Sequence, residues 1–252
     1  MAWRVFAASA IGSSHREDGR PCQDAFALRA QGETLVAAVC DGAGSCELSH
    51  FGARALSESV VRSLAARAQG QILCPDTTED KFKTLVQDAI AEAREVLEAT
   101  AKSAGKDLSA YASTLVGVVA WTSRGHFFHV GDGYAVARPC APEMGDIVSL
   151  PENGEYVNET YFVTGGEWRE HLRTVCFEQA IATVVLMSDG AALFAMAKGH
   201  QELHRPFIDP VQRYLDQVSE AEGTEALAGT LGAPGTDAIT NDDKTLLIAR
   251  KL

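Results

Sequence analysis

The sequence predicts an α+β protein in which two stacked, mainly antiparallel β-sheets are flanked by helices. Short apolar segments follow one another in hairpin-like groups, two long amphipathic segments are inserted between them as a pair, and no repeated strand–helix–strand units are present. The 252 residues, 46% of them hydrophobic and 22% charged, suffice for one core. No repeat or linker divides them, so we expect a single domain over residues 1–252.

Eight segments are predicted to be strands, because each is short, apolar and bounded by turn residues. They are residues 3–8, 35–40, 114–122, 126–130, 134–138, 161–163, 182–187 and 245–249. Several are apolar throughout, which indicates burial on both faces.

Two long helices are predicted between the second and third of these strands, where apolar residues recur at helical spacing. The first covers about residues 49–68 and ends before Gly70; its predicted buried side comprises Phe51, Ala55, Val60, Val61, Leu64 and Ala68. The second begins after Thr77 and Thr78 and ends before Gly105; its predicted buried side comprises Phe82, Leu85, Val86, Ala89, Ile90, Ala93, Val96 and Leu97. Weaker signals predict helices at about 191–197, 206–218 and 222–231, and an elaborated loop at 139–168.

The composition argues against a nucleic-acid partner and against a membrane span. Twenty-two Lys and Arg against 34 Asp and Glu give a formal net charge of −12, which repels a polyanion. No apolar run approaches the roughly 20 residues needed to cross a bilayer, and the first residues lack a basic segment followed by a long apolar one. The six cysteines are widely spaced, as is typical of reduced thiols. We therefore expect a cytoplasmic protein.

The most informative pattern is an Asp-Gly pair directly after an apolar strand, which occurs three times: Asp41-Gly42, Asp132-Gly133 and Asp189-Gly190. A fourth acidic site, Asp242 with Asp243, immediately precedes the last predicted strand. The end of one strand and the start of its antiparallel neighbour lie at the same sheet edge. Four acidic groups can therefore meet at one edge.

Such a cluster points to a divalent cation. Two carboxylates about 4 Å apart repel each other by roughly 4 kcal/mol at an effective dielectric constant near 20, and hard cations with oxygen ligands remove that cost. Each motif also has a simpler interpretation: Asp132 in a hairpin turn, Asp41 as a helix cap or part of an anion-binding nest, and Asp189 as a helix cap. The joint occurrence is harder to explain by independent turns.

In this order the motifs resemble those of the metal-dependent protein phosphatases, the type 2C class of Ser/Thr phosphatases, in their short bacterial form. The matching stretches are Gly12-Ser-Ser-His15 through Pro21-Cys-Gln-Asp24-Ala-Phe26, Val39-Cys-Asp-Gly-Ala-Gly-Ser45, Ser113-Thr-Leu115, Val130-Gly-Asp-Gly133, and Met187-Ser-Asp-Gly190 with Asp242-Asp-Lys-Thr245. The resemblance spans nearly the whole chain.

The resemblance implies a four-layer αββα sandwich that binds two or three Mn²⁺ or Mg²⁺ ions, with a bridging water attacking the phosphoester phosphorus. It implies that Asp41 bridges two metals and that Gly42 offers its carbonyl. Asp189 and Asp242 would complete the first metal site and, with Asp41, form the expected catalytic set. The remaining expected ligands are Asp24, largely through water, at the second metal and Asp132 at a more weakly held third.

Two departures from the family pattern concern the substrate. Gly19 stands where many members place an arginine that holds the phosphate; Arg16 or Arg20 is the expected substitute, with a solvated surface charge as the alternative for either. Ala43 stands where larger eukaryotic relatives carry a histidine, so the general acid is absent from its usual place. His15, for which the sequence identifies no partner, is interpreted as a structural or supporting group.

We therefore expect a Mg²⁺/Mn²⁺-dependent phosphoserine/phosphothreonine protein phosphatase, a monomer that acts on phosphorylated proteins opposite a cognate kinase. The alternative is a catalytically weak or inactive relative that serves as a phosphoprotein- or kinase-binding module, which the missing arginine and histidine favour. Retention of Asp41, Asp189 and Asp242 disfavours it, because a binding module gains nothing from mutually repelling carboxylates.

Overall fold

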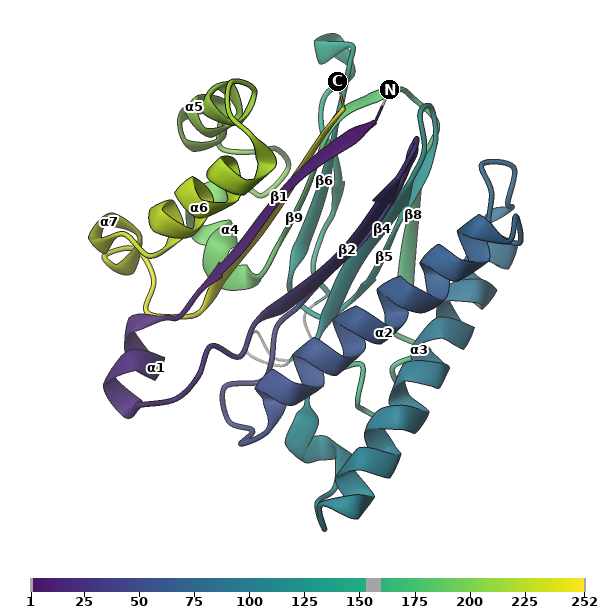
Figure 1. Cartoon of the computed structure of the whole chain (residues 1–252), viewed down its shortest axis with the longest axis vertical. Coiled ribbons are helices and arrows are strands. Elements are labelled where there is room, and N and C mark those ends of the chain that lie inside the picture. Colours follow the sequence, from purple (N-terminus) through teal and green to yellow (C-terminus); the bar gives the residue numbers. More distant parts are fainter. Residues whose placement is uncertain (1, 153–159, 252) are drawn as a thin grey trace.

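The computed structural model describes residues 2–152 and 160–251, and these are arranged in four layers with two β-sheets between two layers of helices (Figure 1). The strands of the first sheet, in spatial order, are β1 (Trp3–Ala10), β10 (Lys244–Lys251), β9 (Ile181–Met187), β6 (Tyr134–Pro139) and β7 (Ile147–Ser149). Those of the second are β2 (Ala25–Gln31), β3 (Thr34–Cys40), β4 (Leu115–Ala120), β5 (Gly125–Val130) and β8 (Arg173–Phe177). Neighbouring strands are antiparallel throughout both orders.

The helices divide between the two outer faces, as Figure 1 shows. The second sheet is covered by α2 (Ser49–Gln69) and α3 (Glu79–Ser103), and the first by α4 (Asp189–Ala195), α5 (Arg205–Leu215) and α6 (Glu220–Leu231). The short helical elements are α1 (Ser13–Asp18), α7 (Pro234–Asp237), η1 (Leu108–Tyr111) and η2 (Pro142–Met144). The predicted α+β fold, an αββα sandwich, is confirmed.

Strand β3 illustrates why the central strands are apolar on both faces. Val36, Ala38 and Cys40 pack against α2 and α3. The alternate residues, such as Leu35 and Val39, pack into the layer between the two sheets. Because side chains alternate across a strand, a strand covered on both sides needs apolar residues at every position.

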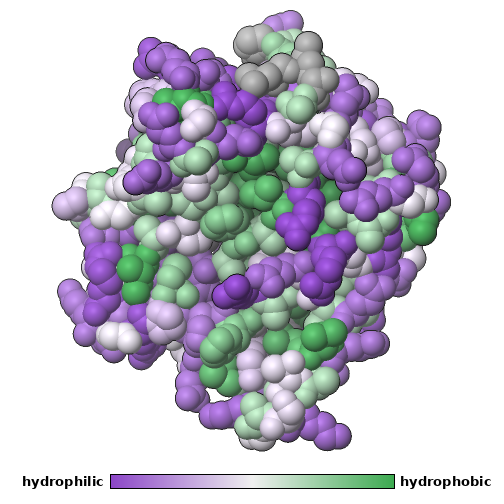
Figure 2. Space-filling model, in the orientation of Figure 1, coloured by the Kyte–Doolittle hydropathy of each residue, from purple (hydrophilic) through white to green (hydrophobic). Residues whose placement is uncertain are grey.

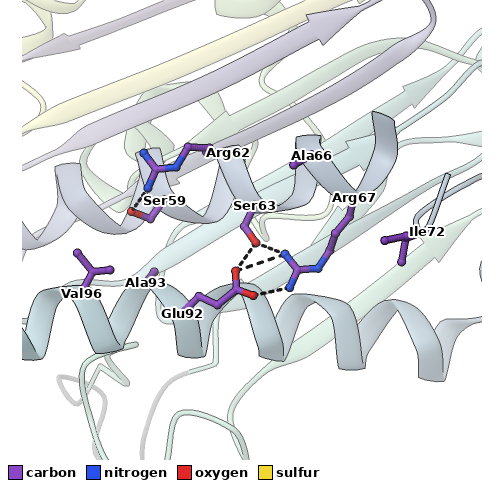
Figure 3. Close-up of a pocket in the computed structure, with 9 residues that line it drawn as sticks. All are labelled: Ser59, Arg62, Ser63, Ala66, Arg67, Ile72, Glu92, Ala93 and Val96. Atoms are coloured by element: carbon purple, nitrogen blue, oxygen red, sulfur yellow. Dashed lines mark hydrogen bonds and ion pairs between the residues drawn. The ribbon is translucent and has the colours of Figure 1, made fainter. Parts of the chain in front are cut away.

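The pairing of α2 with α3 corrects two predicted core positions. Phe51 is 56% exposed and Val96 58% exposed, so both predictions are wrong. In α3 the stripe that faces the core passes through Ala93 and Leu97, which leaves Val96 on the outer rim of a groove between the helices (Figure 3). A three- or four-residue spacing fixes a side of a helix, but not the width of the stripe that a neighbouring helix covers.

Polar groups tie the two helices together across this groove of about 540 Å³. Arg67 Nη2 lies 2.7 Å from Glu92 Oε1, and the Ser63 hydroxyl donates to Glu92 Oε2 at 2.6 Å (Figure 3). No residue of the predicted site lines the groove.

The strands that the sequence did not reveal are β2, β7 and β8, and all three lie at sheet edges. β7 has only three residues, and β2 and β8 are mostly half-buried or exposed, so their hydrophobic pattern is weak. The strand predicted at residues 161–163 is wrong: Val163 is fully buried, but this segment is a loop whose Val163 N–H donates to Ser113 O at 2.8 Å. The predicted loop over 139–168 contains η2 and β7, and its residues 153–159 lie outside the described part of the chain.

The surface of the protein carries both polar and apolar residues. The edge strands β1 and β2 run near each other on the face that Figure 1 presents, and apolar residues gather near the middle of that face in Figure 2, between polar residues on both sides. None of the helices in the described residues is both long enough and apolar enough to cross a membrane.

Candidate active site

The strand topology brings the predicted acidic residues to one edge of the sandwich. Asp24 precedes β2 and Asp41 follows β3, and these strand ends are adjacent because Ala25 pairs with Cys40. In the other sheet Asp189 follows β9 and Asp242 precedes β10, at the end where Met187 pairs with Leu246. Asp132 lies in the connection between β5 and β6, which passes from one sheet to the other. The structure therefore brings all five predicted carboxylates to the same region.

Hydroxyl groups from neighbouring strands hold two of these aspartates. The Thr114 hydroxyl accepts a hydrogen bond from Asp41 N at 3.0 Å, and Thr114 N donates to Asp41 O at 2.8 Å. The Ser188 hydroxyl donates to Asp24 Oδ2 at 2.7 Å and accepts from Thr245 N at 3.0 Å. Ser188 thus links the two sheets, and the Ser-Thr and Ser-Asp-Gly motifs acquire a structural role beside the carboxylates.

Gly42 is required by close approach of two loops. A Cβ at this position would lie 2.7 Å from Gln23 O and 2.9 Å from Ser49 Cβ, and Gly42 N donates to Gln23 O at 3.2 Å. Any side chain would push the loop carrying Gln23 and Asp24 away from Asp41.

The electrostatics of the cluster favour protonated carboxyls when no cation is present. Burial raises the pKa of Asp24 to about 8, with a further contribution from the charge of Asp243. Burial, then Asp24 and Asp189, hold the pKa of Asp41 well above its usual range. Burial and Asp132 raise the pKa of Asp189 to about 6. Asp242 is exposed overall, yet desolvation of its carboxyl group and the charge of Asp243 still raise its pKa.

Unpaired oxygens show that the residues of this cluster fit a cation. The Oδ1 atoms of Asp24, Asp132 and Asp189 are buried and have no hydrogen-bond partner among the described residues. Nowhere in the described ranges are three or more His, Cys, Asp or Glu side chains arranged as a ready-made metal site. The donor set is nevertheless one of hard oxygen atoms, which Mg²⁺ and Mn²⁺ prefer, and a bound cation would supply the partner that each orphaned oxygen lacks.

The two arginines predicted for the substrate phosphate have different surroundings. Arg16 donates to the carboxylate of Asp237 and, at 2.6 Å, to Ile11 O, so its guanidinium is engaged outside the acidic cluster. Arg20 Nη1 donates to Gly44 O at 2.9 Å, in the loop that follows Asp41 and Gly42. Of the two, Arg20 is the one that contacts the loop following Asp41 and Gly42.

Two further interactions at this edge escaped the sequence. The Thr160 hydroxyl donates to Asp132 Oδ2 at 2.7 Å. His15 Nδ1 donates to Asp243 Oδ2 at 2.9 Å. His15 and Asp243 both belong to the matched motifs, but they lie more than two hundred positions apart, and the sequence gives no indication that they are in contact.

Fold and site together define an αββα protein with an acidic centre at the shared edge of its two sheets. A family model described as protein phosphatase 2C matches residues 11–232. The chain therefore belongs to the protein phosphatase 2C family, and with it to the protein serine/threonine phosphatases. The family resemblance inferred from the order of the motifs is confirmed.

Similar proteins agree with this assignment. Serine/threonine-protein phosphatase 3 of Escherichia coli (strain K12) is 27% identical over 260 residues, covering 99% of this chain and 98% of the relative. The catalytic domain of the serine/threonine protein phosphatase PstP, crystallised with two manganese ions, superposes with a TM-score of 0.62 at 15% identity, covering 99% of this chain and 98% of that one. RsbX in complex with magnesium superposes with a TM-score of 0.57 at 13% identity, covering 99% and 95%. At these identities the two structures support the fold.

Proposed function

We propose that this chain hydrolyses phosphoserine and phosphothreonine in proteins, using two or three Mn²⁺ or Mg²⁺ ions. The observation that carries the proposal is the set of buried, unpaired Oδ1 atoms of Asp24, Asp132 and Asp189, contributed from both sheets. The family is metal-dependent, and the donor set suits hard cations. The residues proposed to hold the ions are Asp24, Asp41, the carbonyl of Gly42, Asp132, Asp189 and Asp242.

When bound, the ions would compensate the charge of the phosphoryl group and make water a better nucleophile. The protein's own contribution is to hold the ligands in place. Thr114 fixes the backbone of Asp41, and Ser188 fixes the carboxylate of Asp24. Because positioning dominates phosphoryl transfer, these hydroxyls would support catalysis without touching the substrate.

We propose Arg20 rather than Arg16 as the group that holds the substrate phosphate. Its side chain is exposed, and its contact with Asp18 spans 3.6 Å. Exposed ion pairs of this kind are worth at most about 1 kcal/mol, so the guanidinium is available to an incoming dianion. Arg16 would first have to leave Asp237, which also binds Lys244 Nζ at 2.8 Å.

The chain as a whole, residues 1–252, is proposed to work as one catalytic domain and as a cytoplasmic monomer. Its substrate would be a phosphorylated protein made by a cognate kinase. The net charge of −12 makes nucleic acid an unfavourable ligand.

A second candidate, a weakly active relative that binds phosphoproteins or a kinase, is favoured by one observation. The position of the usual phosphate-binding arginine is Gly19, and Arg16 is paired with Asp237. A binding module does not require the unpaired carboxylate oxygens, so we place it second.

Hydrolysis of p-nitrophenyl phosphate and of phosphoserine and phosphothreonine peptides, with Mn²⁺, with Mg²⁺ and with chelator, tests the proposal. We expect turnover that needs the metal, disappears with chelator and returns on adding Mn²⁺, with Mn²⁺ binding measured in parallel by calorimetry. A matched control is Asp209→Asn, since Asp209 contacts Arg138 outside the cluster. Full activity in chelator would overturn the metal-dependent mechanism, and tight Mn²⁺ binding without hydrolysis of any substrate would favour the binding module.

A further inference from the structure

One carboxylate at the site is already hydrogen-bonded through both of its oxygens. Asp243 is 2% exposed. Its Oδ1 accepts from Gly12 N at 2.6 Å, and its Oδ2 accepts from Gln23 N at 2.6 Å and from His15 Nδ1 at 2.9 Å. These hydrogen bonds fix both the carboxylate and the imidazole, so the orientation of the His15 ring is determined by the buried Asp243.

The other ring nitrogen of His15 faces the loop that follows Asp41 and Gly42. His15 Nε2 lies 4.0 Å from the position that a Cβ on Gly44 would occupy, and Gln23 Oε1 lies 3.9 Å from the same point. Nε2 forms no hydrogen bond within the described residues, although His15 is only 7% exposed. A fixed imidazole with one nitrogen on a buried carboxylate and the other facing the loop that follows Asp41 and Gly42 is the arrangement of a proton-transfer group.

His15 is also close to the proposed metal ligands without being one of them. Burial raises the pKa of Asp242, and the charge of His15 is among the influences that oppose this rise. The imidazole therefore lies within electrostatic reach of the acidic centre. Ala43, which follows Asp41 and Gly42, offers no proton donor of its own.

We infer that His15 is the general acid that protonates the leaving group in the proposed phosphatase reaction, and that Asp243 is its positioning residue; the inference rests on the proposed function. As the bond between phosphorus and the leaving oxygen breaks, its electron pair stays on that oxygen, which takes the proton from Nε2 and departs as the alcohol. Water supplies the oxygen of the new bond to phosphorus and gives up one proton to the solvent. The neutral imidazole keeps its Nδ1–H on Asp243 and regains the Nε2 proton from water.

His171 is the rival candidate among the histidines of the described residues. Its Nδ1 lies 3.4 Å from Glu152 Oε1, but the atom is buried without a hydrogen bond, and the ring stacks on Tyr161 at 3.4 Å. Glu152 is shared with Arg173. His171 thus has a stacking partner and no fixed carboxylate acceptor, which makes it the weaker proton donor on geometric grounds.

The test compares leaving groups of increasing basicity, because a general acid matters most when the departing oxygen is most basic. kcat/KM is measured with Mn²⁺ on p-nitrophenyl phosphate, phenyl phosphate and a phosphoserine peptide. For His15→Asn we expect a loss of less than about tenfold on p-nitrophenyl phosphate and of about 10²- to 10⁴-fold on the peptide. Asp243→Asn should show the same trend with smaller losses. If Asp243→Asn does not fold, His15→Gln provides the second variant.

Three results would overturn the inference: equal losses of His15→Asn on all three substrates, no loss on any, or a loss of Mn²⁺ affinity measured by calorimetry. A leaving-group-dependent loss in His171→Asn, with none in His15→Asn, would assign the role to the rival. The matched control is His204→Asn, because His204 precedes α5 and bonds Phe194 O outside the site. Inactivity of the unaltered enzyme on every substrate would overturn the proposed function itself, and this inference with it.

Discussion

Two kinds of acidic side chain lie at the same edge of the sandwich and differ in how their oxygens are bonded. Asp24, Asp132 and Asp189 each keep a buried Oδ1 without a partner in the described part of the chain. Asp243, which is more deeply buried, has both oxygens hydrogen-bonded, to two backbone N–H groups and to the imidazole of His15. Asp242 and Asp243 are neighbours in sequence, yet Asp242 is exposed and Asp243 is buried.

The difference shows that burial alone does not define a ligand. An isolated carboxylate costs free energy when it leaves water, and the cost is offset either by hydrogen bonds or by a cation. For Asp243 the cost is offset by hydrogen bonds, which also hold the loop carrying His15 in place. We propose that a cation offsets the cost for the unpaired carboxylates, so their removal and the removal of Asp243 should affect stability in opposite directions.

The largest effect is expected for Asp41→Asn and Asp189→Asn. Each removes a proposed anionic ligand, so turnover at saturating Mn²⁺ should fall by about 10³-fold or more. In chelator the same variants should melt at the same temperature as the parent or higher, because a repulsive charge is gone. Steady-state kinetics and thermal melting check this, and folded variants with near-normal turnover would exclude these residues from the metal centre.

In the metal-free protein, Asp243→Ala should lower the stability, which is the reverse of the effect expected for Asp41→Asn and Asp189→Asn. It leaves two buried backbone N–H groups and an imidazole without their acceptor. We expect a loss of about 3 kcal/mol in the free energy of unfolding, or about 6–12 °C in Tm for a chain of this size. Denaturant titration in chelator measures it, and an unchanged midpoint would contradict the distinction between the two sets.

Asp132→Asn tests whether the unpaired set is uniform. The resemblance ties Asp132 to a weakly held third ion, and its Oδ2 already accepts from Thr160. We expect turnover to fall by about 10- to 100-fold, the range found for groups that support a metal from outside its tightest ligands, while the tighter Mn²⁺ sites remain. Loss of all Mn²⁺ binding in calorimetry would show that Asp132 belongs with Asp41 and Asp189.

The mildest perturbation is a change of pH, which removes no side chain. The folded-state pKa values of Asp189, about 6, and Asp24, about 8, lie above the ordinary 3.8. Stability from these groups is complete below about pH 4 and is lost as the pH rises through the folded-state values. The metal-free protein should therefore lose thermal stability between pH 5 and 8, and Mn²⁺ should reverse the loss. The matched comparison is Asp24→Asn, in which the decline should be shallower; an equally steep decline would mean that Asp24 is not its source.

The sequence by itself determined the class of fold and the acidic centre. Central strands that are apolar at every position and two long amphipathic helices predict covered sheets, because those patterns arise from local periodicity. The Asp-Gly pairs at strand ends predicted the positions of Asp41, Asp132 and Asp189, since antiparallel strands share an edge. The edge strands β2, β7 and β8 were missed, because a half-exposed strand leaves little hydrophobic pattern.

Only the tertiary structure decided which of these groups are bonded to one another. Asp243 meets His15 because β10 pairs with β1, which places the loops before β10 and after β1 side by side. Ser188 meets Asp24 because the two sheets stack. Which partner each carboxylate finds depends on contacts between residues far apart in the chain, and local periodicity carries no information about such contacts.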